Sequence, residues 1–182
     1  MVIIGESILL LLNPGDKMAK DATQLSPEWK SMGCTKLVSV HTFDGKPRVD
    51  VRIWEGRTVP RKKGVSFSES GWQKLMVCME KIENMACEVD TESKILLEGN
   101  EEKNYSIYAS IFVGGEDVYV DLRNYFVSEE DGEMHATKKG ICLSESEWSR
   151  LKNAIPEISQ KLLDLQESKE TLRPRGVKAW KK

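Results

Sequence analysis

The chain carries one 15-residue pattern twice, and this repeat limits the possible folds more than any other feature. "RKKGVSFSESGWQKL" occupies residues 61–75 and "TKKGICLSESEWSRL" occupies residues 137–151. Each copy reads Lys-Lys-Gly, three mostly apolar residues, Ser-Glu-Ser, any residue, Trp, a polar pair and Leu. Upstream, "RVDVR" in the first copy matches "YVDLR" in the second, in the same order. Internal similarity of this kind indicates a duplicated structural unit.

The first part of each copy has the alternating pattern of antiparallel strands. Residues 37–43 are rich in β-branched side chains, Asp44-Gly45-Lys46 supplies a turn, and residues 48–54 alternate strictly between apolar and polar. Residues 118–125 alternate in the same way. Two shorter strands are expected to follow in each copy, broken at Gly64 or Gly140, because glycine tolerates turns that other residues resist.

After Ser-Glu-Ser the apolar spacing changes to the helical period in both copies. One helical face carries Trp72, Leu75, Met76, Met79, Ile82 and Met85, and the other copy has Trp148, Leu151, Ile155, Ile158, Leu162 and Leu165. Ser144 and Glu147 have the spacing of a capping box, whereas Gly71 replaces the glutamate in the first copy and leaves that cap half made. Pro156 is expected to kink or interrupt the second helix. Each unit is therefore predicted to be four strands followed by one helix.

A unit of this size is marginal alone, because it buries too little surface and leaves an apolar helical face uncovered. We therefore expect an α+β fold in which two tandem units pack helix to helix as an intramolecular pseudo-dimer. A true dimer of chains that exchange units is the competing arrangement. The expected segments are a flexible N-terminal extension (1–33), the first unit (34–86), an acidic linker (87–103), the second unit (104–167) and a basic tail (168–182).

The formal net charge of −2 conceals an uneven distribution. Residues 34–86 hold ten Lys/Arg and six Asp/Glu, a balance of +4, whereas residues 104–167 hold six and twelve, a balance of −6. The tail from residue 168 has six basic residues and one acidic residue, a balance of +5. A basic first unit and tail favour an anionic partner, and an acidic second unit does not.

No motif points to an enzyme, a metal or a cofactor. His41 and His135 fall at unrelated places in the two copies, and no nucleophile elbow, zinc-protease or phosphate-loop motif occurs. The four cysteines lie 44, 9 and 55 residues apart, which makes no short zinc-binding pair and favours free thiols. The apolar run at residues 8–12 is too short to cross a membrane.

The combined motifs resemble one known family. "LVSVHTFDGKPRVDVRIWEG" followed by "PRKKGVSFSESGWQKL" is similar to the C-terminal domain of positive cofactor four, a transcriptional coactivator of RNA polymerase II. The resemblance spans residue 36 to about residue 86, and again residue 105 to about residue 165. It implies helix-swapped four-strand-plus-helix units that bind single-stranded or unpaired DNA on the sheet, here with the dimer fused into one chain.

Candidate DNA-binding residues come from the residues themselves and from the resemblance. Binding a single strand without sequence preference needs cations for the phosphates and aromatic rings for the bases. The polar face of the second strand and the next connection offer Arg48, Arg52, Trp54, Arg57, Arg61, Lys62 and Lys63. The resemblance places contacts at Phe43, Arg52, Lys63, Arg123, Phe126 and Lys139, and their neighbours Tyr125 and Lys138 complete the predicted set.

Several positions depart from the family pattern or have a structural alternative. The family's stacking tryptophan aligns with Glu55, beside Trp54, and a basic residue of its first strand aligns with His41. In the second copy the hairpin aromatic is displaced to Phe112 or lost. The acidic residues Glu129, Glu130, Asp131 and Glu133 crowd the nearby connection, and such charges repel phosphate. We therefore expect the first copy to bind DNA more strongly, with a mainly structural second copy as an alternative. Arg52 and Arg123 could instead pair with Asp50 and Asp121.

These features predict a non-enzymatic, nuclear, single-stranded-DNA-binding coactivator that acts with RNA polymerase II and the general transcription machinery. The alternative is a protein–protein adaptor of that machinery which kept the fold and lost much of its DNA affinity. No cofactor and no membrane association are expected.

Overall fold

The computed structural model describes residues 22–25, 34–56, 58–100, 102 and 104–171, the last four without their side chains. The first unit contains β1 (Thr23–Gln24), β2 (Cys34–Phe43), β3 (Lys46–Glu55), β4 (Val59–Ser68) and α2 (Glu69–Glu88). The second contains β5 (Lys94–Asn100), β6 (Tyr105–Gly114), β7 (Asp117–Val127), β8 (Met134–Ser144) and α3 (Glu145–Thr171). Each set of strands forms an antiparallel sheet in chain order. The predicted α+β fold of two tandem four-strand-plus-helix units is confirmed.

The fourth strand of each unit is not where the sequence predicted it. Residues 59–68 and 134–144 each form one continuous strand, and the additional strands come first, as β1 and β5. β5 lies inside the segment expected to be an acidic linker, and β1 lies inside the expected N-terminal extension. β5 alternates across the sheet, with Ile95 and Leu97 buried in the core and Lys94 and Leu96 exposed. The sequence reasoning overlooked this alternation, because the segment around β5 is rich in acidic residues.

Gly64 and Gly140 do not break their strands but allow a close approach of the neighbouring strand, to its backbone at Gly64 and to the Arg123 side chain at Gly140. Arg52 lies opposite Gly64 but Trp54 lies opposite Pro60, so residues 61–63 bulge out of β4. The same register shift makes residues 137–139 bulge out of β8 opposite β7. A Cβ atom at Gly64 would lie 2.6 Å from the carbonyl oxygen of Val51, so a larger residue would push the strands apart. The repeated Lys-Lys-Gly motif is therefore a β-bulge followed by a tight crossing.

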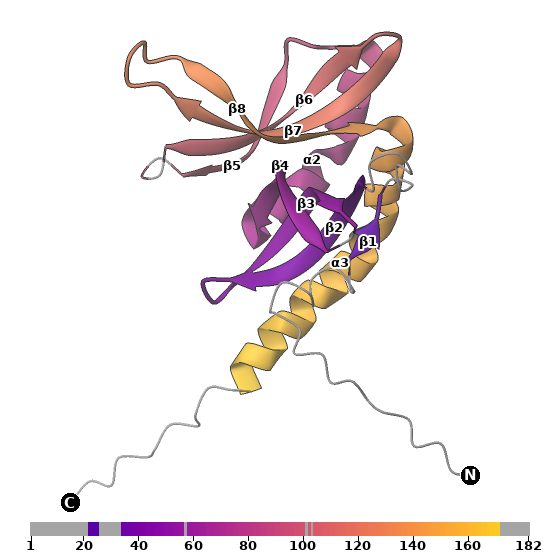
Figure 1. Cartoon of the computed structure of the whole chain (residues 1–182), viewed down its shortest axis with the longest axis vertical. Helices are drawn as coiled ribbons and strands as arrows, with labels where there is room; N and C mark the ends of the chain where they lie inside the picture. The colour runs from indigo at the N-terminus through magenta and orange to yellow at the C-terminus, as the bar shows by residue number, and fades with distance from the viewer. Residues whose placement is uncertain (1–21, 26–33, 57, 101, 103, 172–182) are drawn as a thin grey trace, which may run out of the picture.

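Both helices contact both sheets, which joins the units into one body. α2 packs on β3 and β4 of its own unit and on β5, β6 and β7 of the other, and α3 packs on β7 and β8 and on β2 and β3. In Figure 1 the two sheets lie one above the other with α2 between them, and α3 runs along the side of the lower sheet. One hydrophobic core contains Phe67 and Trp72 from the first unit and Leu143 and Trp148 from the second. The chain is thus an intramolecular pseudo-dimer.

The two helices begin with caps of different origin. In α3, Ser144 and Glu147 form the predicted capping box: Glu147 N donates to Ser144 Oγ and Ser144 N donates to Glu147 Oε2. In α2, Gly71 N donates to Ser68 Oγ, and Ser68 N donates to Oε2 of Glu98 in β5 at 2.7 Å. The cap predicted to be half made is therefore completed by the second unit. α3 also continues through Pro156 and is not interrupted there.

Candidate nucleic-acid interface

Each sheet has an outer face, on which side chains alternate with those of the shared core. On the first sheet this face carries Leu37, Ser39, His41, Phe43, Arg48, Asp50, Arg52 and Trp54. On the second sheet it carries Tyr108, Ser110, Phe112, Tyr119, Asp121, Arg123 and Tyr125. Most predicted contact residues lie on these two faces or on the bulges beside them.

At the centre of each outer face, an arginine is held by a buried aspartate. Arg52 donates from Nε to Asp50 Oδ2 at 2.6 Å and from Nη2 to Oδ1 at 2.9 Å. Arg123 donates to Asp121 at 2.8 and 3.0 Å. The pKa of both arginines is raised, mainly because of these hydrogen bonds. The alternative of aspartate pairing is therefore correct, and it leaves each guanidinium as a fixed cation whose side chain is still 21% or 25% exposed.

The bulges anchor on the same arginines and present the lysines to solvent. Arg52 Nη1 donates to the carbonyl oxygen of Arg61, and Arg123 Nη1 donates to that of Thr137, each at 2.9 Å. The bulge lysines, which are Lys62, Lys63, Lys138 and Lys139, are all exposed. Arg61 pairs with Glu55 at 2.6 Å, and Arg57 lies outside the described residues. Each unit therefore places two exposed lysines beside one fixed arginine.

The predicted aromatic residues differ in accessibility. Phe43 is 68% exposed and Phe126 is 41% exposed, so either ring is open to a ligand. Trp54 is only 1% exposed, since it packs against Leu37 and Ala22, and Tyr125 is 7% exposed. In this conformation neither ring offers a free face to a base, although both lie on the outer faces as predicted.

The predicted set of contact residues leaves out several groups on the second outer face. Tyr108 packs edge-on against Tyr125 at a centroid distance of 5.3 Å, and the Nζ atom of Lys94 lies 5.1 Å from the centre of the Tyr125 ring. Phe112 packs against Tyr119 at 6.2 Å. The alternation of Tyr108, Ser110 and Phe112 could have placed these β6 residues on one face. Lys94 could not be placed, because the sequence reasoning did not predict β5.

His41 is not a substitute for a basic family residue at neutral pH. Burial lowers the pKa of its ring below the ordinary value of 6.5. Asp50 partly opposes that shift, while Arg48 and Arg52 reinforce it. A histidine with a lowered pKa is uncharged at pH 7. Its neighbour Arg48 bonds to Ser66 and reaches Glu98 at 3.5 Å, so part of its charge is directed towards the second unit.

Acidic side chains border the second outer face at the β7–β8 connection. Glu129, Glu130 and Glu133 are exposed, and Asp131 bonds to Nε2 of His135 at 2.9 Å. The pKa of Asp131 is lowered, first by the backbone N–H of Glu133 and then by His135, so this carboxylate is ionised at neutral pH. Phosphates are therefore disfavoured at this end of the second unit.

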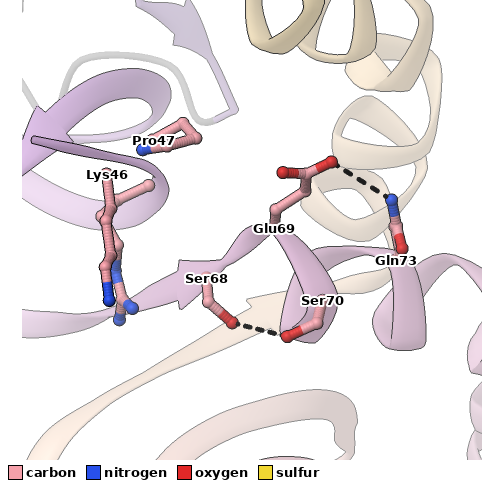
Figure 2. Close-up of a pocket in the computed structure, with 7 residues that line it drawn as sticks. Lys46, Pro47, Ser68, Glu69, Ser70 and Gln73 are labelled. Atoms are coloured by element: carbon pink, nitrogen blue, oxygen red, sulfur yellow. Dashed lines mark hydrogen bonds between the residues drawn. The ribbon is translucent and has the colours of Figure 1, made fainter. Parts of the chain in front are cut away.

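The described part of the chain offers little to a small ligand. A shallow hollow lies between the start of β3 and the start of α2, lined by Lys46, Pro47, Arg48, Ser68, Glu69, Ser70 and Gln73 (Figure 2). The hydroxyl groups of Ser68 and Ser70 bond to each other at 3.0 Å, and the Gln73 amide donates to Glu69 Oε1 at 3.5 Å. Among the described residues, no group of three His, Cys, Asp or Glu side chains could hold a metal ion, and no helix could span a membrane.

Fold and surface together define a duplicated sheet-and-helix module whose outer faces each carry a fixed arginine and a lysine bulge. A sequence profile of the family Transcriptional Coactivator p15 (PC4) matches residues 30–77 and 104–154, which is more than half of the chain. The chain belongs to this family, with one copy in each unit. It is also similar to a Caenorhabditis elegans protein named "Putative RNA polymerase II transcriptional coactivator", at 41% identity over 56 residues. That match covers 30% of this chain and 44% of the relative, less than half of its length.

Proposed function

We propose that the chain is a nuclear, non-enzymatic transcriptional coactivator that binds single-stranded or unpaired DNA on its outer faces and acts with the RNA polymerase II machinery. One observation supports this most strongly: the same constellation of fixed arginine, tight glycine crossing and two exposed lysines occurs in both units. Exposed cations suit a single strand, because they bind phosphates while leaving the bases free to stack.

Fluorescence anisotropy with a labelled oligonucleotide of about 20 bases tests the proposal, with two bulge variants. Lys62→Ala/Lys63→Ala and Lys138→Ala/Lys139→Ala each remove two exposed cations. Loss of two phosphate contacts is expected to weaken binding about tenfold or more at about 0.1 M salt. Lys74→Ala/Lys81→Ala is the matched control, because it removes the same charge from exposed positions of α2. No binding by the unaltered chain, or equal losses in the control, contradicts the proposal.

The acidic β7–β8 connection favours a second candidate, a protein–protein adaptor of the transcription machinery with little DNA affinity. Its exposed carboxylates would suit a basic protein surface. A pull-down from nuclear extract with the unaltered chain and with Glu129→Gln/Glu130→Gln/Glu133→Gln discriminates the two. An adaptor would recover transcription proteins only with its carboxylates intact and would bind no oligonucleotide. Recovery that is the same for both chains would remove the support for this candidate.

A further inference from the structure

The two units differ at one equivalent position of their outer faces, near the first hairpin of each unit. In the first sheet His41 lies opposite Arg48, and in the second sheet Phe112 lies opposite Tyr119. The first pair consists of an imidazole ring and a guanidinium group, and the guanidinium of Arg48 is a permanent cation. The second is a pair of aromatic rings with centroids 6.2 Å apart and planes inclined at 43°.

The aromatic pair is accessible to solvent, and the absence of a side chain at Gly114 leaves room for both rings. Phe112 is 52% exposed and Tyr119 is partly exposed. A Cβ atom at Gly114 would lie 3.2 Å from Cε1 of Phe112 and 3.3 Å from Cε2 of Tyr119, so the glycine leaves room for both rings. Gly114 takes the place that Phe43 has in the first unit. The hairpin aromatic of the second unit is thus displaced inward onto the sheet.

The charges around the two rings favour different locations for a base and for its phosphates. Glu116 and Asp117 lie in the chain next to the two rings, and the Tyr119 hydroxyl donates to Asp117 Oδ2 at 3.3 Å, which disfavours a phosphate there. Arg123 lies four residues along β7, or about 13 Å, from Tyr119 on the same face. Lys138 and Lys139 protrude beside Arg123. A short single strand would reach both, with a base on the rings and its phosphates towards the cations.

We propose that Phe112 and Tyr119 form a base-stacking platform for single-stranded DNA on the second sheet. On this proposal the second unit is the main base-binding half: it presents the two rings as a pair, whereas the first unit presents Phe43 alone, because its Trp54 is covered. This rests on the proposed function and reverses the expectation that the first copy dominates binding. It assigns a ligand role to Tyr119, which the sequence reasoning did not single out, and to Phe112, which that reasoning considered only as a displaced hairpin aromatic.

An oligonucleotide of about 20 bases and an abasic strand of the same length test the platform by anisotropy. Phe112→Leu, alone and with Tyr119→Leu, keeps an apolar surface but removes the aromatic faces. We expect the double variant to bind the normal strand about fivefold or more weakly, and the abasic strand as the unaltered chain does. Val113→Ala is the matched control, because Val113 is exposed beside Phe112 but on the opposite face.

The outcomes separate the two proposals. Normal binding by both ring variants overturns the platform and leaves single-stranded-DNA binding intact, and so does an equal loss for normal and abasic strands. Absence of oligonucleotide binding by the unaltered chain overturns both. Normal DNA binding combined with the loss of a captured transcription protein would make the rings a protein contact and would overturn the platform. Circular dichroism checks that each variant is folded.

Discussion

At the scale of single residues, sequence alternation predicted which face each side chain occupies but not what covers it. Arg52 and Trp54 were both placed correctly on the outer face by the alternating pattern of residues 48–54. Whether Trp54 is open depends on Ala22, which packs over it from the β1 segment. That contact joins residues 32 positions apart and leaves no local pattern. The pairing of Arg52 with Asp50 was visible as an alternative, because the two residues share a face at a separation of two.

Cys142 is expected to react slowly with alkylating reagents. Burial and the neighbouring Asp121 raise the pKa of its thiol to about 11, so little reactive thiolate exists at pH 7.5. Cys87 is exposed and is the internal comparison. Peptide mass spectrometry after timed iodoacetamide labelling should find Cys87 modified well before Cys142. Equal labelling rates in the folded chain would contradict this environment for Cys142.

At the scale of elements, local caps were predictable and caps made across the chain were not. The Ser144 and Glu147 box follows from a spacing of three residues. The cap of α2 uses Glu98, which is 30 residues from Ser68 and lies in a strand that the sequence reading missed. Gly71 was read as a defect, yet a Cβ atom there would lie 2.2 Å from Oε2 of Glu98. Glycine at this position is what admits the distant carboxylate.

A double-mutant cycle tests whether Glu98 takes the place of a local capping glutamate in α2. Glu98→Ala should lower the free energy of unfolding by about 1–3 kcal/mol, because Ser68 N, Arg48 and Tyr105 lose a largely buried acceptor. Gly71→Glu should also destabilise, because its side chain meets Glu98. The double variant should be less destabilised than the sum, since it restores a local box as in α3. Urea unfolding gives the free energy of unfolding of all four proteins. Strictly additive losses would contradict the claim that the side chains at positions 71 and 98 compete for the same space.

At the scale of the whole molecule, the duplication has become a pair of unequal units. Pairing of the units was predictable, because neither buries enough surface alone. Their inequality was not, because it depends on contacts between residues far apart in sequence. Lys36 of β2 lies 2.6 Å from Glu147 at the start of α3, with side chains 11% and 8% exposed. Ile107 of β6 occupies the place of Lys36 in the second unit, so this ion pair has no counterpart.

Removing the inter-unit cation should destabilise the whole chain in one step. Lys36→Met leaves Glu147 buried without its cation, which typically costs about 3–5 kcal/mol. Lys36→Met/Glu147→Gln should recover much of that loss, because glutamine can still accept from Ser144 N. Calorimetry should show a single transition for each protein, because both units share one core. Two separate transitions would contradict a shared core.

A chain that contains both partners should also be monomeric. Sedimentation equilibrium at low micromolar concentration is expected to give the mass of one chain, 20.7 kDa. A clean two-chain mass with no monomer would instead indicate units exchanged between chains.

The central claim, that the duplicated outer faces bind unpaired DNA, is tested most directly by a salt titration. Anisotropy with a 20-base single strand, beside a duplex of equal length, gives the affinity across a range of salt concentrations. If about four phosphates are bound, the logarithm of the association constant should fall with the logarithm of salt at a slope of about −2.8, with the single strand preferred. A flat salt dependence, or equal affinity for the duplex, would contradict the account.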